Sequence, residues 1–205
     1  MAIADKKTGS YAWVILIGAF LTFQIQPIIG KSILPWFGGT PAVWAVCMLF
    51  FQIFLFGGYL YAHLLTSKVK PAAQFKWHGT LLIVSTLLII SRSVLPAETL
   101  KPGPDTWPTM RILIILMMTI GLPYLCLTAG SPLIQFWFSQ IHASKEPYRL
   151  YVFSNIGSLF ALLSYPILAE PLFTLHAQST IWIVIFIVFA LSCFFIVKRY
   201  AQYGV

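Results

Sequence analysis

The feature that most constrains this chain is an apolar run from Pro41 to Leu65 that contains no Asp, Glu, Lys or Arg. As an α-helix rising about 1.5 Å per residue, this run of 25 residues reaches roughly 37 Å, which is longer than the hydrocarbon core of a bilayer is thick. Such a run is typical of a membrane-spanning helix. Lipid is therefore expected to surround much of the folded chain.

The composition agrees with this interpretation, because 59% of the residues are hydrophobic, only 9% are charged, and the mean hydropathy is +0.86. Soluble domains average about 25% charged residues. Apolar segments of spanning length occur at residues 11–29, 41–65, 78–95, 111–129, 150–169 and 179–197. They lack barrel-like alternation, so each is predicted to be a helix. The predicted fold class is an all-α polytopic membrane protein, and six helices are also the number in one half of a major-facilitator fold.

The lysines and arginines predict the orientation in the membrane. With the N-terminal tail (1–10) and the C-terminal tail (198–205) both in the cytoplasm, nine basic residues lie inside: Lys6, Lys7, Lys68, Lys70, Lys76, Lys145, Arg149, Lys198 and Arg199. Four lie outside: Lys31, Arg92, Lys101 and Arg111. The net charge of +8 is thus explained by orientation in a membrane, and nucleic acid is not a predicted partner.

Motifs for catalysis or cofactor binding are missing from the sequence. It has no Gly-rich phosphate loop, no GxSxG, no HExxH and no paired carboxylates. Cys47, Cys126 and Cys193 lie in or beside apolar runs without CxxC spacing, so they are interpreted as small core or lipid-facing residues. The sequence predicts a protein that is not an enzyme, with no catalytic residue, cofactor or metal.

Polar side chains inside spans are costly, so they mark candidate sites of function or of association with other subunits. Gln24 and Gln26 precede Pro27, which frees a backbone carbonyl one turn earlier. A partly broken helix flanked by two amides could coordinate a small polar solute. The alternative is that these amides form interhelical hydrogen bonds that hold the bundle together.

Two opposite charges are expected at the outer membrane face. Lys31 follows the first span and Glu170 ends the fifth. We expect them to form an ion pair, with two separately solvated charges as the alternative.

A stripe of small residues in the fifth span favours close helix packing. It consists of Ser154, Gly157, Ser158 and Ala161. Asn155 lies beside this stripe, and its predicted role is an interhelical hydrogen bond. His63, which ends the second span, is a further candidate, but it has no second ligand at metal-binding spacing. The full candidate set is Gln24, Gln26, Lys31, His63, Asn155 and Glu170.

Prolines and glycines predict irregular geometry in the fourth span. Gly121 and Pro123 predict a kink, and Gly130 with Pro132 predicts the end of the span. The following segment, SPLIQFWFSQIH, would then form an amphipathic helix along the cytoplasmic interface. Continuation of the fourth helix is the alternative.

Three long motifs suggest a family. They are QPIIGKSILPWFGGTPAVWAVCMLFFQIFLFGGYLYAH, GLPYLCLTAGSPLIQFWFS and EPYRLYVFSNIGSLFALLSYPILAEP, in that order. The chain resembles, over about residues 11–197, the membrane part of bacterial fused transporter-like/spermidine synthase proteins. The resemblance extends to the residues Gln26, Pro27, Lys31, Pro35, Gly38, Gly39, Trp44, Tyr61, His63, Pro132, Gln135, Tyr151, Asn155, Gly157, Tyr165, Pro166, Glu170 and Pro171.

The resemblance implies a membrane domain and no synthase activity. The family's Gly-rich nucleoside-binding strand and acidic catalytic residues are absent from these residues, and the loop LLTSKVKPAAQFK lacks the Gly-Asp-Arg type motif of major-facilitator proteins. The first hypothesis is a non-enzymatic membrane subunit or scaffold, in contact with lipid and with other membrane subunits or copies of itself. The alternative is a dimeric secondary transporter of a polyamine, amino acid or organic anion, with Gln24, Gln26, Lys31, Asn155 and Glu170 lining the route.

Overall fold

The computed structural model describes residues 2–103, 107–142 and 148–203, and the side chains within these ranges except those of residues 2–7 and 148. Within them every regular element is helical. Six stretches of the described chain are long and apolar enough to cross a membrane: Thr8–Phe37, Pro41–Lys68, Pro71–Arg92, Pro108–Ile141, Arg149–Leu172 and Leu175–Tyr203. The predicted all-α polytopic membrane fold is confirmed.

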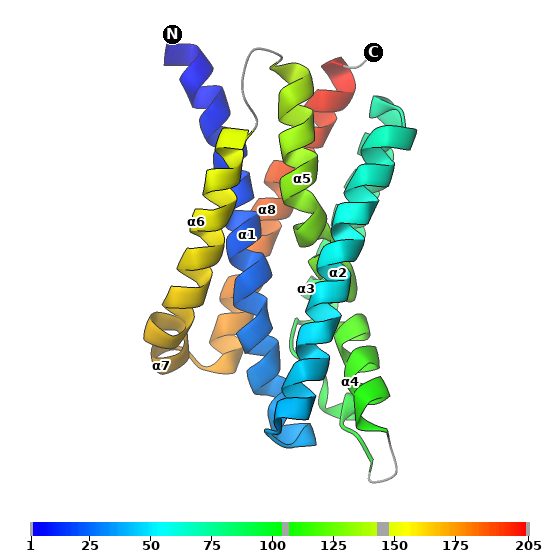
Figure 1. Ribbon diagram of the computed structural model, residues 1–205, viewed down its shortest axis with the longest axis vertical. Coiled ribbons are helices and arrows are strands. Elements are labelled where there is room, and N and C mark those ends of the chain that lie inside the picture. The colour runs from blue at the N-terminus through cyan, green and yellow to red at the C-terminus, as the bar shows by residue number, and fades with distance from the viewer. Residues whose placement is uncertain (1, 104–106, 143–147, 204–205) are drawn as a thin grey trace.

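Figure 1 shows these helices running side by side along one axis, with the two chain ends at the same end of the bundle. We refer to that end as the terminal end and to the other as the distal end. The helices are α1 (Ala2–Phe37), α2 (Pro41–Lys68), α3 (Pro71–Arg92), α4 (Pro108–Leu116), α5 (Leu122–Ile141), α6 (Tyr148–Ser164), α7 (Glu170–Leu172) and α8 (Leu175–Tyr203). Shorter elements are the 3₁₀ turn η1 (Glu98–Leu100) and the π-helical turns η2 (Met117–Gly121) and η3 (Tyr165–Ala169).

Prolines set the starts of three helices. Pro41, Pro71 and Pro108 each occupy the first turn of α2, α3 or α4, where a missing backbone N–H costs nothing and the fixed φ favours the helix. Before α2, the backbone N–H of Val43 donates to the hydroxyl of Thr40 at 3.5 Å. Gly38 has a φ of +80°, which only glycine adopts without strain, and it allows the chain to reverse between α1 and α2.

The centre of the bundle is formed by α1, α5 and α8. The first and fourth spans are 67% and 61% buried, whereas the α2 and α6 spans are only 28% and 22% buried. Helix α1 contacts α5, α6 and α8, while α2 packs on α5 and α3 packs on α8. The peripheral helices therefore present most of their surface to whatever surrounds the bundle.

One aromatic ring fixes the spacing of the three central helices. Phe189 of α8 lies against two glycines: a Cβ at Gly18 of α1 would be 2.8 Å from its ring, and one at Gly130 of α5 would be 2.9 Å away. Any larger residue at either position would displace the ring or the helix. Phe189 is almost completely buried.

Helix α6 is held close to α1 by the small-residue stripe that the sequence predicts. Gly157 and Ala161 are buried, and a Cβ at Gly157 would collide with the carbonyl oxygen of Leu16. The backbones of the two helices thus approach closely, as small residues allow in membranes.

The fourth span differs from its predicted end. Pro132 lies inside α5, which continues to Ile141, so the predicted interfacial helix is wrong and the alternative of a continuous helix is correct. Trp137 and Phe138 explain why, since both are buried in the bundle core. The irregularity predicted at Gly121 and Pro123 takes the form of the π-helical turn η2.

The first span is also more regular than predicted. Pro27 lies within an unbroken α1, so no open backbone site forms beside Gln24 and Gln26. The third span begins at Pro71, seven residues before its predicted start at residue 78. Helix α1 begins at Ala2, so most of the predicted N-terminal tail is helical, while residues 1 and 204–205 of the two tails lie outside the described part of the chain.

Candidate functional site

An ion pair joins α1 to α7 at the distal end of the bundle. Lys31 Nζ lies 3.1 Å from Glu170 Oε1, and the two side chains are 43% and 48% exposed. The predicted pair is confirmed. At this exposure such a pair is worth about 0–1 kcal/mol, so it orients the end of the fifth span more than it stabilises the fold.

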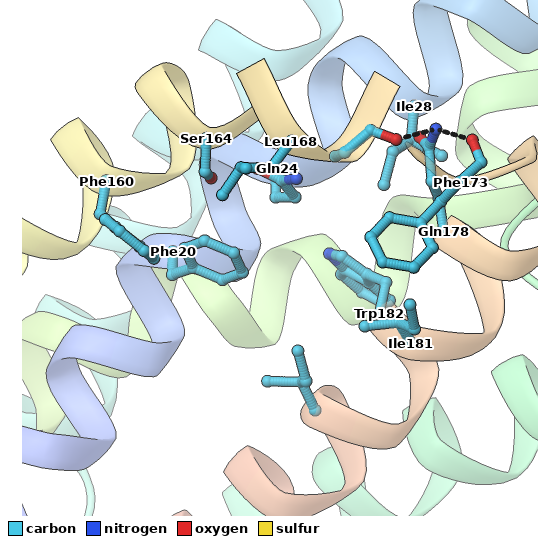
Figure 2. Close-up of a pocket in the computed structure, with 12 residues that line it drawn as sticks. Phe20, Gln24, Ile28, Phe160, Ser164, Leu168, Phe173, Gln178, Ile181 and Trp182 are labelled. Carbon is cyan, nitrogen blue, oxygen red and sulfur yellow. Dashed lines mark hydrogen bonds between the residues drawn. The ribbon is translucent and has the colours of Figure 1, made fainter. Parts of the chain in front are cut away.

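A cavity of about 210 Å³ lies between α1, the fifth span and α8. Figure 2 shows Phe20 and Phe160 at one end of it, Trp182 and Ile181 at the other, and Gln24 between them. The cavity is lined by twelve residues, which are Phe20, Gln24, Ile28, Phe160, Ser164, Leu168, Ala169, Phe173, Gln178, Ile181, Trp182 and Ile185.

Gln24 lines this cavity with a side-chain amide that lacks hydrogen-bond partners among the described residues. Its side chain is 8% exposed, yet its amide forms no hydrogen bond with any residue that the structure describes, and Oε1 is fully buried. The predicted alternative of an interhelical hydrogen bond therefore does not apply to Gln24. A buried amide without a partner costs free energy that the fold does not recover.

Gln178 is a second cavity residue, one that the sequence analysis did not select. Its Nε2 donates to the carbonyl oxygens of Ala169 at 3.0 Å and Phe173 at 2.8 Å. These are the bonds drawn as dashed lines in Figure 2, and they close the turn between α7 and α8. Its Oε1, like that of Gln24, is buried and has no partner in the described chain.

Gln26 forms an interhelical hydrogen bond, which was the alternative prediction for Gln24 and Gln26. Its Nε2 donates to the hydroxyl of Tyr124 on α5 at 3.1 Å and lies 3.4 Å from the carbonyl oxygen of Thr22. It does not line the cavity. Gln26 therefore fastens α1 to α5.

Asn155 and His63 lie away from the cavity, on the surface of the bundle. Both side chains are exposed, and neither forms an interhelical hydrogen bond within the described residues. Asn155 does not form the predicted interhelical hydrogen bond within the described chain, because the small-residue stripe faces α1 and Asn155, one residue after Ser154, is turned about 100° from it. The five residues of the predicted solute route are thus not gathered along one path.

The structure adds a buried polar network in the terminal half of the bundle, between α2, α3, α5 and α8. The indole N–H of Trp137 donates to Gln74 Oε1 at 2.9 Å, and Gln74 Nε2 donates to the carbonyl oxygen of Val69 at 2.8 Å. Gln74 is 1% exposed. Both ends of this amide are satisfied, and together they tie the start of α3 to α5.

His78 extends the network one turn further along α3. Its Nδ1 lies 3.3 Å from the hydroxyl of Tyr61 on α2, and its Nε2 lies 3.7 Å from the Sγ of Cys193 on α8. The ring also packs edge-to-face on Trp137. Fully buried and bonded on both sides, His78 has the surroundings of a structural residue.

A sequence signal for this network exists. Gln74, His78 and Ser85 recur at helical spacing and form the buried polar stripe of α3. Because the third span was predicted to begin at residue 78, Gln74 was assigned to a loop. A start at Pro71 would have placed all three on one helix face.

Comparison with protein-family models, with curated proteins and with solved structures finds no match to this chain. Within the described residues, no group of three or more His, Cys, Asp or Glu side chains is placed to hold a metal ion. Fold and site together define a multi-pass membrane protein. The described part of the chain holds an apolar cavity with an unpartnered amide, and a buried network of hydrogen-bonded polar side chains.

Proposed function

We propose that this chain is a non-enzymatic subunit of a larger membrane complex in the bacterial inner membrane, with both termini in the cytoplasm. The observation that carries the proposal is the exposed amide of Gln52 on α2. The excess of lysine and arginine on the side of the termini supports the orientation. The resemblance to the membrane part of fused synthase proteins supports an anchoring role.

Gln52 lies deep within the span. It follows the start of α2 by 11 residues and precedes its end by 16, so it is about 16 Å and 24 Å from the two helix ends. Its side chain is exposed and forms no hydrogen bond with any described residue. An amide facing hydrocarbon at this depth is costly, and such residues usually face another helix.

The neighbours of Gln52 form a continuous stripe along α2. The stripe consists of exposed residues that are alternately four and three positions apart. They are Ala45, Leu49, Gln52, Phe56, Tyr59 and His63. This spacing is the seam along which two helices pack at a small crossing angle. The stripe includes the candidate residue His63 and explains why it is exposed. We call it the α2 seam.

The first test is purification from native membranes in a gentle detergent, followed by mass spectrometry and the native mass of the particle. We expect other membrane subunits in stoichiometric amounts, and expect Gln52→Leu to weaken their retention. Gln140→Leu is the matched control, because Gln140 is an exposed amide near the end of α5. A particle with the mass of one chain and no partner would overturn the proposal.

Transport of a small solute by a dimer is the second candidate. It rests on one observation, namely that Gln24, one of the residues predicted to line a route, lies at a cavity. The lining of that cavity carries no charge, which weighs against the charged solutes among the candidates. The test is flux in liposomes for polyamines, amino acids and organic anions, with Gln24→Leu as the comparison. Saturable flux that this substitution abolishes would favour transport over a purely structural subunit.

A further inference from the structure

The cavity at Gln24 has a neutral and mostly apolar wall. None of its twelve lining residues is charged, and the nearest acid along the chain, Glu170, is paired with Lys31. A charged or strongly hydrated solute would lose its water there without gaining an opposite charge. The wall therefore selects against polyamines, amino acids and organic anions.

The cavity opens sideways towards the membrane. Four residues of its lining are largely exposed: Phe160 at 58%, Leu168 at 48%, Phe173 at 43% and Ile181 at 42%. Phe160, Leu168 and Ile181 belong to spans that are long and apolar enough to cross a membrane, so we expect lipid beside them. A molecule dissolved in the bilayer would reach Gln24 without crossing water.

The volume and the aromatic lining limit the shape of the occupant. A cavity of about 210 Å³ exceeds the roughly 150 Å³ that holds one benzene ring and is smaller than the roughly 300 Å³ at which drug-sized pockets begin. Phe20, Phe160, Phe173 and Trp182 supply aromatic surfaces around it (Figure 2). One ring with small substituents fits this space, and an attached chain would extend into the lipid.

The unpartnered amide of Gln24 supplies the polar contact. An amide both donates and accepts hydrogen bonds, so it can bind a carbonyl or a hydroxyl group. Ligand pockets commonly combine an apolar wall with a few such groups that fix orientation. The amide that has no partner in the fold is thus suited to an external one.

We propose that this cavity binds an uncharged, membrane-dissolved molecule that carries a carbonyl or hydroxyl group on an apolar ring. Quinones and ring-bearing alcohols share this chemistry. The proposal goes beyond the role as a subunit and does not depend on it, because the cavity and the α2 seam lie on different helices.

The test measures binding to the full chain in nanodiscs with three probes of similar size: a decyl-substituted benzoquinone, decylphenol and decylbenzene. We expect saturable binding of one molecule per chain for the benzoquinone, the phenol or both, about fivefold to tenfold tighter than for decylbenzene, which cannot bond to the amide. Preference for the first or second probe separates quinones from alcohols.

Two variants and one control sharpen the result. Gln24→Leu should reduce binding of the polar probes to the level of decylbenzene, and Ser164→Phe should fill the cavity and weaken binding of all three. Gln26→Leu is the control, because this amide is two residues away on α1 and bonds to Tyr124 instead. No saturable binding, or equal binding by the parent chain and Gln24→Leu, would overturn the proposal.

Discussion

Two buried glutamines divide this bundle into regions of different character. In the terminal half, Gln74 is bonded at both ends of its amide, to Trp137 and to Val69. Towards the distal end, Gln24 is nearly as buried, but its amide has no partner in the described chain. The same residue type thus stabilises the fold in one place and, in our proposal, binds a ligand in the other. Burial alone does not distinguish the two amides, whereas their hydrogen bonding does.

The most direct test of the difference between Gln74 and Gln24 is to remove each amide in turn. We expect Gln74→Leu to lower the free energy of unfolding by about 2–4 kcal/mol, because it leaves the indole N–H of Trp137 and the carbonyl of Val69 unpaired. Gln24→Leu should change it by less than about 1 kcal/mol, since no bond is lost. Unfolding in mixed micelles on titration with SDS measures both. Equal losses would contradict the distinction.

The close packing of α6 on α1, beside the cavity, provides the second test. Gly157→Val should cost about 1–3 kcal/mol, because the added atoms collide with the carbonyl of Leu16 on α1 and move α6 outward. Leu159→Val, at a position 57% exposed on the same helix, is the control. The same SDS titration applies, and a tolerated valine at position 157 would show that α6 is not fixed against α1.

A smaller effect is expected within the buried network. Tyr61→Phe removes the hydroxyl that lies 3.3 Å from His78 Nδ1, and we expect a loss of about 0.5–1.5 kcal/mol. Tyr59→Phe is the matched control, because Tyr59 is on the same helix but 52% exposed. Thermal unfolding in detergent would resolve the pair. If the two substitutions had the same effect, the bond to His78 would contribute nothing.

The smallest effect belongs to the distal ion pair. Lys31→Glu and Glu170→Lys should each cost about 0.2–1 kcal/mol, and the double exchange should restore most of the loss. The measurement is a double-mutant cycle of unfolding free energies at low salt, where screening is weakest. Strictly additive losses would mean that the two charges act separately.

The sequence predicted which segments span the membrane better than it predicted which face of each helix is buried. Hydropathy located all six spans, and the alternation of membrane sides was enough to bring Lys31 and Glu170 together. Asn155 was misplaced because the face that a span buries depends on its neighbours and not on its own composition. Pro132 was misread because tertiary packing of Trp137 and Phe138 carries α5 past it.

The sequence predicted only part of the candidate site, for a similar reason. Gln24 was selected as a polar residue in a span, but its lack of a partner depends on the side chains around it. Gln74 was missed because the predicted helix began at residue 78, four residues after it, whereas the structure starts α3 at Pro71. The exposure of Gln52 could not be predicted either, since α2 is apolar on every side.

The contact of Phe189 with Gly18 and Gly130 has a mechanical consequence. One ring sets two helix separations at once, so α8 cannot rotate without changing its distance from both α1 and α5. These three helices would then move as one rigid body. Any adjustment to lipid thickness or to a bound molecule falls to α2, α3 and the fifth span, which are the helices with the most open surface.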